Sequence, residues 1–198
     1  MRITARQLSG IGAVLLLGLT APSVVLAQTV HVRWDIIHFV FSTPREAFEG
    51  GVADAKAPDG TTLRLTGTGE FFARDGLRVG SGIATGGGSW QVLSPTGVVL
   101  ASGTYRATEL VSWEFANLFT PAAFIDHIGP NGASGNAVLL IEYSDGSQGV
   151  LSVLCSGPGA PAGISEGVAA TKGFKTYDQV QAFAAGVDLN RTTFHILR

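Results

Sequence analysis

Glycine followed two residues later by an aromatic residue recurs through the middle of the chain, at Gly69 and Phe71, at Gly88 and Trp90, and at Gly103 and Tyr105. Residues two apart share one face of a strand. An aromatic ring can cover a glycine on its own strand or on the neighbouring strand, and the missing side chain lets the strand coil sharply. The repeat therefore predicts curved antiparallel strands like those that wrap small barrels.

Three successive glycines at residues 86–88 also admit a second interpretation, a phosphate-binding loop. Such a loop requires a helix whose N-terminus points at the anion. The residues that follow, "SWQVLSPTG", have the pattern of a strand and a turn. The pattern therefore favours a bend in a strand over a phosphate site.

Turn signals separate further strand-like segments between residues 61 and 115, which indicates an antiparallel meander. The composition agrees, because 14% charged residues and 27 glycines favour tight turns over a helical bundle. We predict an all-β fold of about seven or eight strands with one or two short helices. An antiparallel β-barrel is preferred, and a β-sandwich is the alternative.

The two ends of the predicted fold are strands that alternate in polarity. In the segment 31–41, Val32, Trp34 and Ile36 share one face, and a second alternating strand covers residues 191–197. A terminal strand with so clear a pattern is expected to close the sheet.

The clearest predicted element is a hairpin with Asp145 and Gly146 as its two-residue turn. This turn would pair Glu142 with Gly149. Both faces of the hairpin are largely apolar, so we expect a cover on each side. Two short helices are predicted, over residues 121–128 and 176–185, and residues 42–60 are predicted to form a loop with one helical turn after Pro44.

The first 27 residues resemble a secretory signal peptide, with Arg2 and Arg6 before an apolar run and small residues before Ala27. Cleavage there leaves residues 28–198 as one domain, expected to be secreted or periplasmic, with no membrane span. Its 11 basic and 15 acidic residues argue against nucleic acid as a partner. The single cysteine, Cys155, cannot form an internal disulfide and is expected to be a buried, inert thiol.

Polar residues of the first strand form the main candidate ligand-binding site. His31, Arg33 and Asp35 share one face at a spacing of about 7 Å between alternate residues. Facing a lumen, this row could orient a ligand or transfer protons. Facing solvent, it would keep an edge strand soluble.

Two further residues are candidates for catalysis. His38 falls in register with the apolar face of the first strand, where a histidine is either a hydrogen-bonded core residue or a ligand contact. Glu142 lies on an apolar face of the hairpin, where burial would raise its pKa as a general acid requires. A one-residue slip in register would instead place Glu142 in water.

The remaining histidines give no metal signature. Asp126 and His127 are adjacent residues of an expected helix and would not face each other, although with His195 they could help to form a metal site. The four histidines are scattered, without the close spacing of zinc ligands. We therefore expect neither a metal nor a cofactor.

The glycine-rich strands "GTGEFF" and "GGGSWQV" resemble those of the allene oxide cyclase and dirigent group, and the chain is also similar to secreted bacterial proteins. This resemblance implies an eight-stranded barrel whose lumen binds an apolar ligand, and no catalytic residue of the group maps onto this chain. Apart from the resemblance, Trp90 and Tyr105 are candidate ligand contacts together with His31, Arg33 and Asp35. The sequence leaves three functions open: a binder of a small apolar ligand, a cyclase or isomerase that uses a lumen carboxylate, and an interaction module with a packed core.

Overall fold

The computed structural model describes residues 29–74, 82–120, 124–180 and 186–197, and these residues form fourteen strands and no helix. The expected signal peptide lies outside the described residues. In chain order the strands are β1 (Thr29–Val40), β2 (Glu46–Glu49), β3 (Ala53–Lys56), β4 (Thr62–Leu65), β5 (Thr68–Arg74), β6 (Gly82–Ile83), β7 (Gly87–Leu93), β8 (Val99–Leu118), β9 (Ile125–Asp126), β10 (Gly132–Tyr143), β11 (Gln148–Cys155), β12 (Gly167–Lys172), β13 (Lys175–Gln179) and β14 (Thr192–Ile196).

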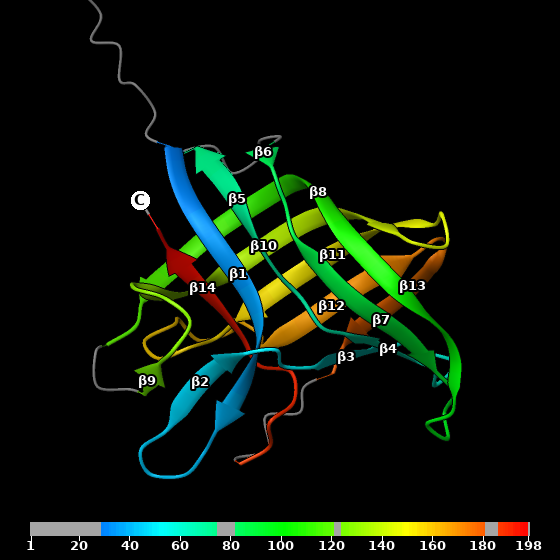
Figure 1. Cartoon of the computed structure of the whole chain (residues 1–198), viewed down its shortest axis with the longest axis horizontal. Helices are drawn as coiled ribbons and strands as arrows, with labels where there is room; N and C mark the ends of the chain where they lie inside the picture. Colours follow the sequence, from blue (N-terminus) through cyan, green and yellow to red (C-terminus); the bar gives the residue numbers. More distant parts are fainter. Residues whose placement is uncertain (1–28, 75–81, 121–123, 181–185, 198) are drawn as a thin grey trace, which may run out of the picture.

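The strand pairings form a ring. Starting from β8, they run through β10, β11, β12, β13, β3, β4 and β7, and β7 pairs with β8 again. All of these pairings are antiparallel. The expected all-β, antiparallel character is therefore confirmed (Figure 1).

A second route joins β7 to β10 through β5, β1 and β14. In Figure 1 the blue β1 and the red β14 run side by side. The C-terminal strand is thus held between β1 and β10, which confirms the prediction that it closes the sheet.

A small sheet extends from the far end of β1. Residues 37–40 leave β14 and pair with β2, and β2 in turn pairs in parallel with β9. We call these residues of β1, together with β2 and β9, the small sheet. It lies apart from the ring strands at the lower end of β1 in Figure 1.

One apolar cluster fills the interior of the ring. Val32, Trp34 and Ile36 all belong to it and are fully buried, as the alternation of the first strand predicts. Trp90 and Tyr105 also lie in this cluster. Because these large side chains pack against one another, the described interior is a core.

The predicted contact between an aromatic side chain and a glycine is confirmed between neighbouring strands. Trp34 lies opposite Gly69 and Trp90 opposite Gly103. A methyl group added at Gly69 would come within 2.8 Å of the indole nitrogen of Trp34, and at Gly103 within 2.9 Å of that of Trp90. Each ring therefore occupies the space that a side chain would need.

The glycines at 86–88 bend the chain into a strand. Gly86 has a φ of 88°, a conformation that favours glycine, and β7 follows directly. No helix begins there, so the phosphate-loop interpretation is excluded.

The strand count and the helices are corrected by the structure. Fourteen strands replace seven or eight, because the structure contains several short strands that the sequence pattern does not mark. Residues 46–49 and 53–56 of the expected loop are two of them, so the helical turn expected after Pro44 is a strand instead. The expected helix over 176–185 begins instead as β13, which the turn at Gly173 folds back onto β12. At the other expected helix, residues 125–126 form β9; residues 121–123 and 181–185 lie outside the described residues.

The hairpin is present, but its register is shifted by one residue. Tyr143 donates its backbone N–H to Ser147, which leaves a three-residue loop with Gly146 at a φ of 85°. Glu142 therefore lies opposite Gln148 instead of Gly149. A turn followed by a glycine in this conformation is the usual three-residue alternative to a two-residue loop. The outer face of the hairpin is only partly covered, with Leu140 exposed, so the expected double cover is not present among the described residues.

Candidate functional site

A pocket of about 880 Å³ lies where the small sheet meets the end of the ring. Its lining comes from four parts of the chain: the end of β1 with the residues after it, the residues before β9, the end of β11 with the residues after it, and the start of β14 with the residues before it. The lining residues are Ile37, Phe39, Phe41, Arg45, Phe119, Phe124, Cys155, Ser156, Gly157, Pro158, Gly159, Ala160, Glu166, Gly186, Arg191, Thr192 and Thr193.

Four phenylalanines form an aromatic wall of this pocket. The ring of Phe39 lies 4.8 Å from that of Phe41 and 5.3 Å from that of Phe124, edge to face. Phe119 contacts Phe124 at 5.5 Å. Such edge-on contacts are favourable for aromatic pairs. All four side chains are only partly buried, so an apolar surface faces the pocket.

The geometry of β1 explains how this wall arises. Successive side chains of a strand point to opposite faces, so residues 31, 33, 35, 37, 39 and 41 lie on one face. The first three are polar, and Ile37, Phe39 and Phe41 are apolar. The outward face of β1 is therefore charged beside β14 and apolar where it lines the pocket.

The opposite wall carries a carboxylate held by the backbone. Glu166 accepts hydrogen bonds from the backbone N–H of Ser156 at 2.7 Å and from that of Thr192 at 2.9 Å. Burial raises the pKa of Glu166, and these bonds together with the nearby Arg191 oppose that rise. Glu166 thus fixes the loop after β11 to the start of β14.

Two arginines line the pocket. The guanidinium of Arg191 lies 5.2 Å from the centre of the Phe41 ring, within the range of a cation–π contact. Arg45 is exposed at the rim, and its backbone carbonyl accepts the N–H of Ile125 at 2.9 Å. The backbone of Arg45 is therefore tied to the small sheet.

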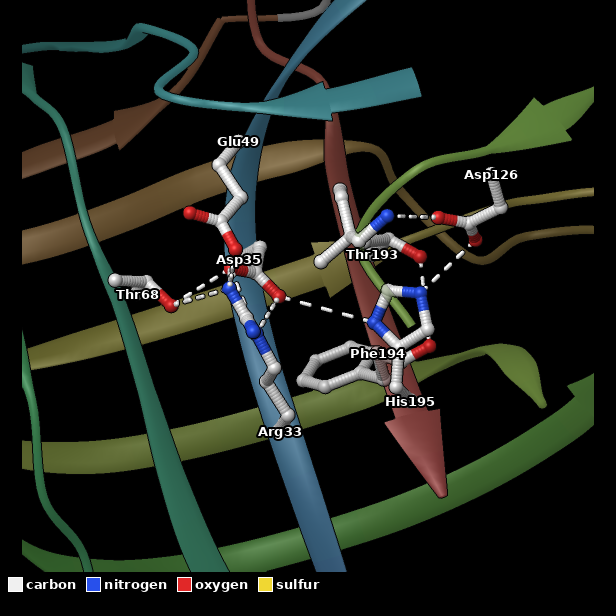
Figure 2. A network of polar contacts seen from close by, with 9 residues as sticks. Arg33, Asp35, Glu49, Thr68, Asp126, Thr193, Phe194 and His195 are labelled. Atoms are coloured by element: carbon white, nitrogen blue, oxygen red, sulfur yellow. Dashed lines mark hydrogen bonds and ion pairs between the residues drawn. The ribbon is translucent and has the colours of Figure 1, made fainter. Parts of the chain in front are cut away.

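Beside the pocket, a chain of charged side chains crosses β1 and β14 (Figure 2). Arg33 donates to both carboxylate oxygens of Asp35, at 2.9 Å from each nitrogen, and to Glu49 at 2.5 Å. Thr68 donates its hydroxyl to Asp35 at 2.6 Å. Asp35 is 1% exposed, so this carboxylate depends on these donors.

His195 joins this network to the small sheet. Its Nε2 atom lies 2.9 Å from Asp126, and its Nδ1 atom lies 3.7 Å from Asp35, an ion-pair distance that is too long for a hydrogen bond (Figure 2). Burial lowers the pKa of His195, but the two carboxylates outweigh it and the pKa lies above its ordinary value. The imidazole is therefore stabilised in its charged form.

The pKa values of the two aspartates are shifted in the opposite direction to that of His195. Burial raises the pKa of Asp35, but the neighbouring His195, Arg33 and Thr68 outweigh it and hold the pKa below its ordinary range. The pKa of Asp126 is also lowered, because its bond with His195 and its backbone bonds exceed the effect of burial. His195 and Asp35 are buried at the centre of this network, and the contacts between them connect β1 and β14.

The predicted ligand-binding residues are separated by the fold. Arg33 and Asp35 meet in the buried network, while His31 bonds to Glu70 at 2.8 Å and stacks on Phe72. Trp90 donates its indole N–H to the carbonyl of Thr104, and Tyr105 donates its hydroxyl to that of Thr66. Trp90 and Tyr105 are core residues and do not line the pocket, so their role as ligand contacts stays a prediction.

The burial expected for the catalytic candidates is also wrong. His38 is exposed and pairs with Asp188, because β1 turns into the small sheet after Ile36 and the apolar face ends there. Glu142 pairs with Arg106 on the outer face, with its side chain 39% exposed. The two candidates do not meet, and neither lines the pocket.

Cys155 is buried as expected, and burial raises the pKa of its thiol well above the ordinary value. Among the described residues, no group of three or more histidine, cysteine or acidic side chains could hold a metal ion. Within that same part of the chain, no helix is long and apolar enough to span a membrane.

Comparisons of the chain with protein-family models, with curated proteins and with solved structures found no match.

Sequence reasoning missed most of this pocket. One signal was present: the face of β1 that begins with His31, Arg33 and Asp35 becomes apolar at Ile37 and stays so through Phe41. Phe119, Glu166 and Arg191 carry no such signal, because only the closure of the ring brings them to the end of β1.

Proposed function

We propose that this protein is an exported β-barrel protein that binds a small, mostly apolar molecule between the small sheet and the end of the ring. The pocket of about 880 Å³ with its four phenylalanines carries the proposal. Small-molecule sites are typically concave, mostly apolar and about 300–1,000 Å³ in volume. The pocket meets all three conditions.

We also propose that the circuit of strands is a closed barrel. The closed circuit of antiparallel pairings and the apolar cluster inside it support a barrel over a sandwich of two separate sheets. The likeness to allene oxide cyclase and dirigent proteins stays a prediction. Unlike the lumen site that this likeness implies, the proposed site lies at the end of the ring, because side chains fill the interior.

Export is proposed on the sequence alone. Residues 1–27 have the charged start, apolar run and small-residue ending of a signal peptide. N-terminal sequencing of the protein from the culture medium or periplasm of its host should begin at residue 28. An intact N-terminus at Met1 would contradict export by this route.

Binding can be tested with an uncharged apolar dye such as Nile red. The purified protein should bind the dye with a rise in fluorescence. Ala160→Trp places an indole in the pocket and should weaken binding at least roughly tenfold, a change of about 1.4 kcal/mol. Ala101→Trp adds the same side chain at an exposed position of β8 and is the matched control.

Both variants should keep the wild-type melting temperature, so that lost binding is not lost folding. Equal dye binding by wild type and Ala160→Trp would place the dye elsewhere and contradict the proposed pocket. Native mass spectrometry of the protein from its host is the complementary measurement, since a co-purified molecule would add a fixed mass to the chain.

One observation favours the interaction module as a second function. Val98 and Leu100, near the β7–β8 turn, and Phe174, in the β12–β13 turn, are exposed. Exposed apolar side chains at hairpin tips are available for contacts with another protein. Phe174→Ser should leave dye binding unchanged. It should weaken any association through the β12–β13 turn, and analytical ultracentrifugation measures that association. The enzyme alternative has no comparable support, since Glu142 is engaged with Arg106 on the outer face.

A further inference from the structure

The charged residues that line the pocket are unequal in number. Arg45 and Arg191 carry positive charges, and Glu166 is the one acidic side chain in the described lining. A pocket with an excess of positive charge favours a ligand with a negative charge, because opposite charges attract.

Glu166 and Arg191 are already engaged with the chain. Glu166 accepts the two backbone N–H groups and also the hydroxyl of Ser156 at 3.1 Å. Arg191 lowers the pKa of Glu166 through its charge and lies over Phe41. These two opposite charges therefore offset each other at the inner wall.

Arg45 differs from both. It is exposed at the rim, and no carboxylate within residues 29–74, 82–120, 124–180 and 186–197 forms an ion pair with its guanidinium. Its backbone bond to Ile125 holds it beside the aromatic wall. The pocket thus presents an apolar surface with a cation at its open edge.

We propose that the pocket binds an apolar molecule with a carboxylate head group, which pairs with Arg45 while the apolar part lies against the phenylalanines. This inference rests on the proposed function of the pocket and names the chemical class of its ligand. A guanidinium matches a carboxylate because its N–H groups can donate two parallel hydrogen bonds to the two oxygens. The head group stays at the rim, where water can still reach it, so little of its hydration is lost.

Two probes that differ only in the head group test this inference. Isothermal titration calorimetry should show the wild-type protein binding dodecanoate roughly tenfold more tightly than dodecanol, as a charge-assisted bond predicts. In Arg45→Gln, dodecanoate should fall to the affinity of dodecanol, and dodecanol should bind as it does to wild type. Arg45→Lys should recover part of the preference, because it keeps the charge without the fork geometry.

Arg106→Gln is the matched control. Arg106 is exposed and pairs with Glu142 away from the pocket, so this variant should keep the full preference for dodecanoate. If both probes bind wild type equally, or if Arg45→Gln keeps the preference, the carboxylate inference is overturned and the apolar pocket stands. If neither probe binds and Nile red does not bind either, the proposed function fails together with the inference.

Discussion

At the scale of single residues, the charged network shows how a buried histidine is tolerated. His195 has no exposed surface, and an isolated charge there would be costly. Asp126 and Asp35 lie on either side of the imidazole, and Arg33 and Thr68 satisfy Asp35 in turn. Breaking such a group by removing one member leaves its partners uncompensated, at a cost of about 3–5 kcal/mol.

The network predicts how stability depends on pH. The pKa of His195 is raised above its ordinary 6.5, so its charge stabilises the folded state below pH 6.5, and this contribution is lost as pH rises through the folded-state pKa. The pKa of Asp35 is lowered below 3.8, so its contribution is present above that pH and is lost on acidification. Urea unfolding from pH 3 to 9 should therefore give the highest free energy of unfolding between about pH 4 and 6.5.

His195→Gln should lower the free energy of unfolding at pH 6 by about 3–5 kcal/mol and remove the decline above pH 6.5. His31→Gln is the control, because His31 pairs with Glu70, whose side chain is 47% exposed, and it should keep that decline. Asp126→Asn retains the imidazole and should destabilise the protein less than His195→Gln. It should also reduce the loss of unfolding free energy above pH 6.5, because it removes one of the two carboxylates that raise the pKa of His195. An unchanged alkaline decline in both His195→Gln and Asp126→Asn would refute the role given to His195.

At the scale of elements, the local pattern predicts strands until a partner changes. Val32, Trp34 and Ile36 are found where alternation places them, since β1 keeps the same neighbours over that stretch. His38 is not, since β1 pairs with β2 from residue 37 onwards. The expected helix at 176–185 failed for a similar reason, because the short hairpin at Gly173 supplies backbone partners to Thr176 and Tyr177.

The candidate site was harder to foresee than the strands. Asp35 and His195 were both identified as polar residues of terminal strands, but their approach depends on β14 pairing with β1. Contacts between residues so far apart in sequence leave no periodic signal in either strand. The predicted register of the hairpin is wrong by one residue for a local reason. The same residues, Asp145 and Gly146, fit a two-residue loop or a three-residue loop, and the structure has the three-residue loop.

Close strand contacts give a prediction for Gly69. A methyl group there would lie 2.0 Å from the backbone carbonyl oxygen of Thr85 and 2.8 Å from the indole nitrogen of Trp34. Gly69→Ala should therefore lower the free energy of unfolding by about 1–3 kcal/mol or more, because neither the backbone nor the packed ring can move freely. Chemical denaturation measures the change.

Gly97→Ala is the comparison, because nothing lies within 4 Å of a methyl group at that turn and only its φ of 85° opposes the change. Its cost should be about 1 kcal/mol. If Gly69→Ala lowered the free energy of unfolding less than Gly97→Ala does, the space between Gly69 and the Trp34 ring would be larger than the structure indicates.

At the scale of the whole molecule, the second route between β7 and β10 depends on the last strand, β14. β14 pairs with β1 over residues 192–196 and contacts β10 at Gly132 and Ala133. It also supplies Phe194 to the core and Thr192 and Thr193 to the pocket. One strand thus connects the core, the charged network and the proposed site.

Removing residues 192–198 should therefore abolish cooperative unfolding, because it exposes the edge of β1 and leaves Asp35 beside an unfilled space. Urea titrations followed by tryptophan fluorescence and by circular dichroism should give transitions that no longer coincide. Removing residue 198 alone is the control and should leave the transition unchanged. A shortened chain that still unfolds in one coincident transition would contradict this role of β14.

The pairing of β1 with β14 also bears on when the molecule can fold. Sheet formation is slow when its partners are distant in sequence, since the chain must lose much of its freedom before the contacts form. Here one edge of β1 can pair with β5 at residues 68–74, but its other edge pairs with residues 192–196, far along the chain. Until β14 is available, this edge of β1 has unpaired backbone groups. A partly folded chain would then be prone to aggregate unless a chaperone covers the edge or β14 pairs with it quickly.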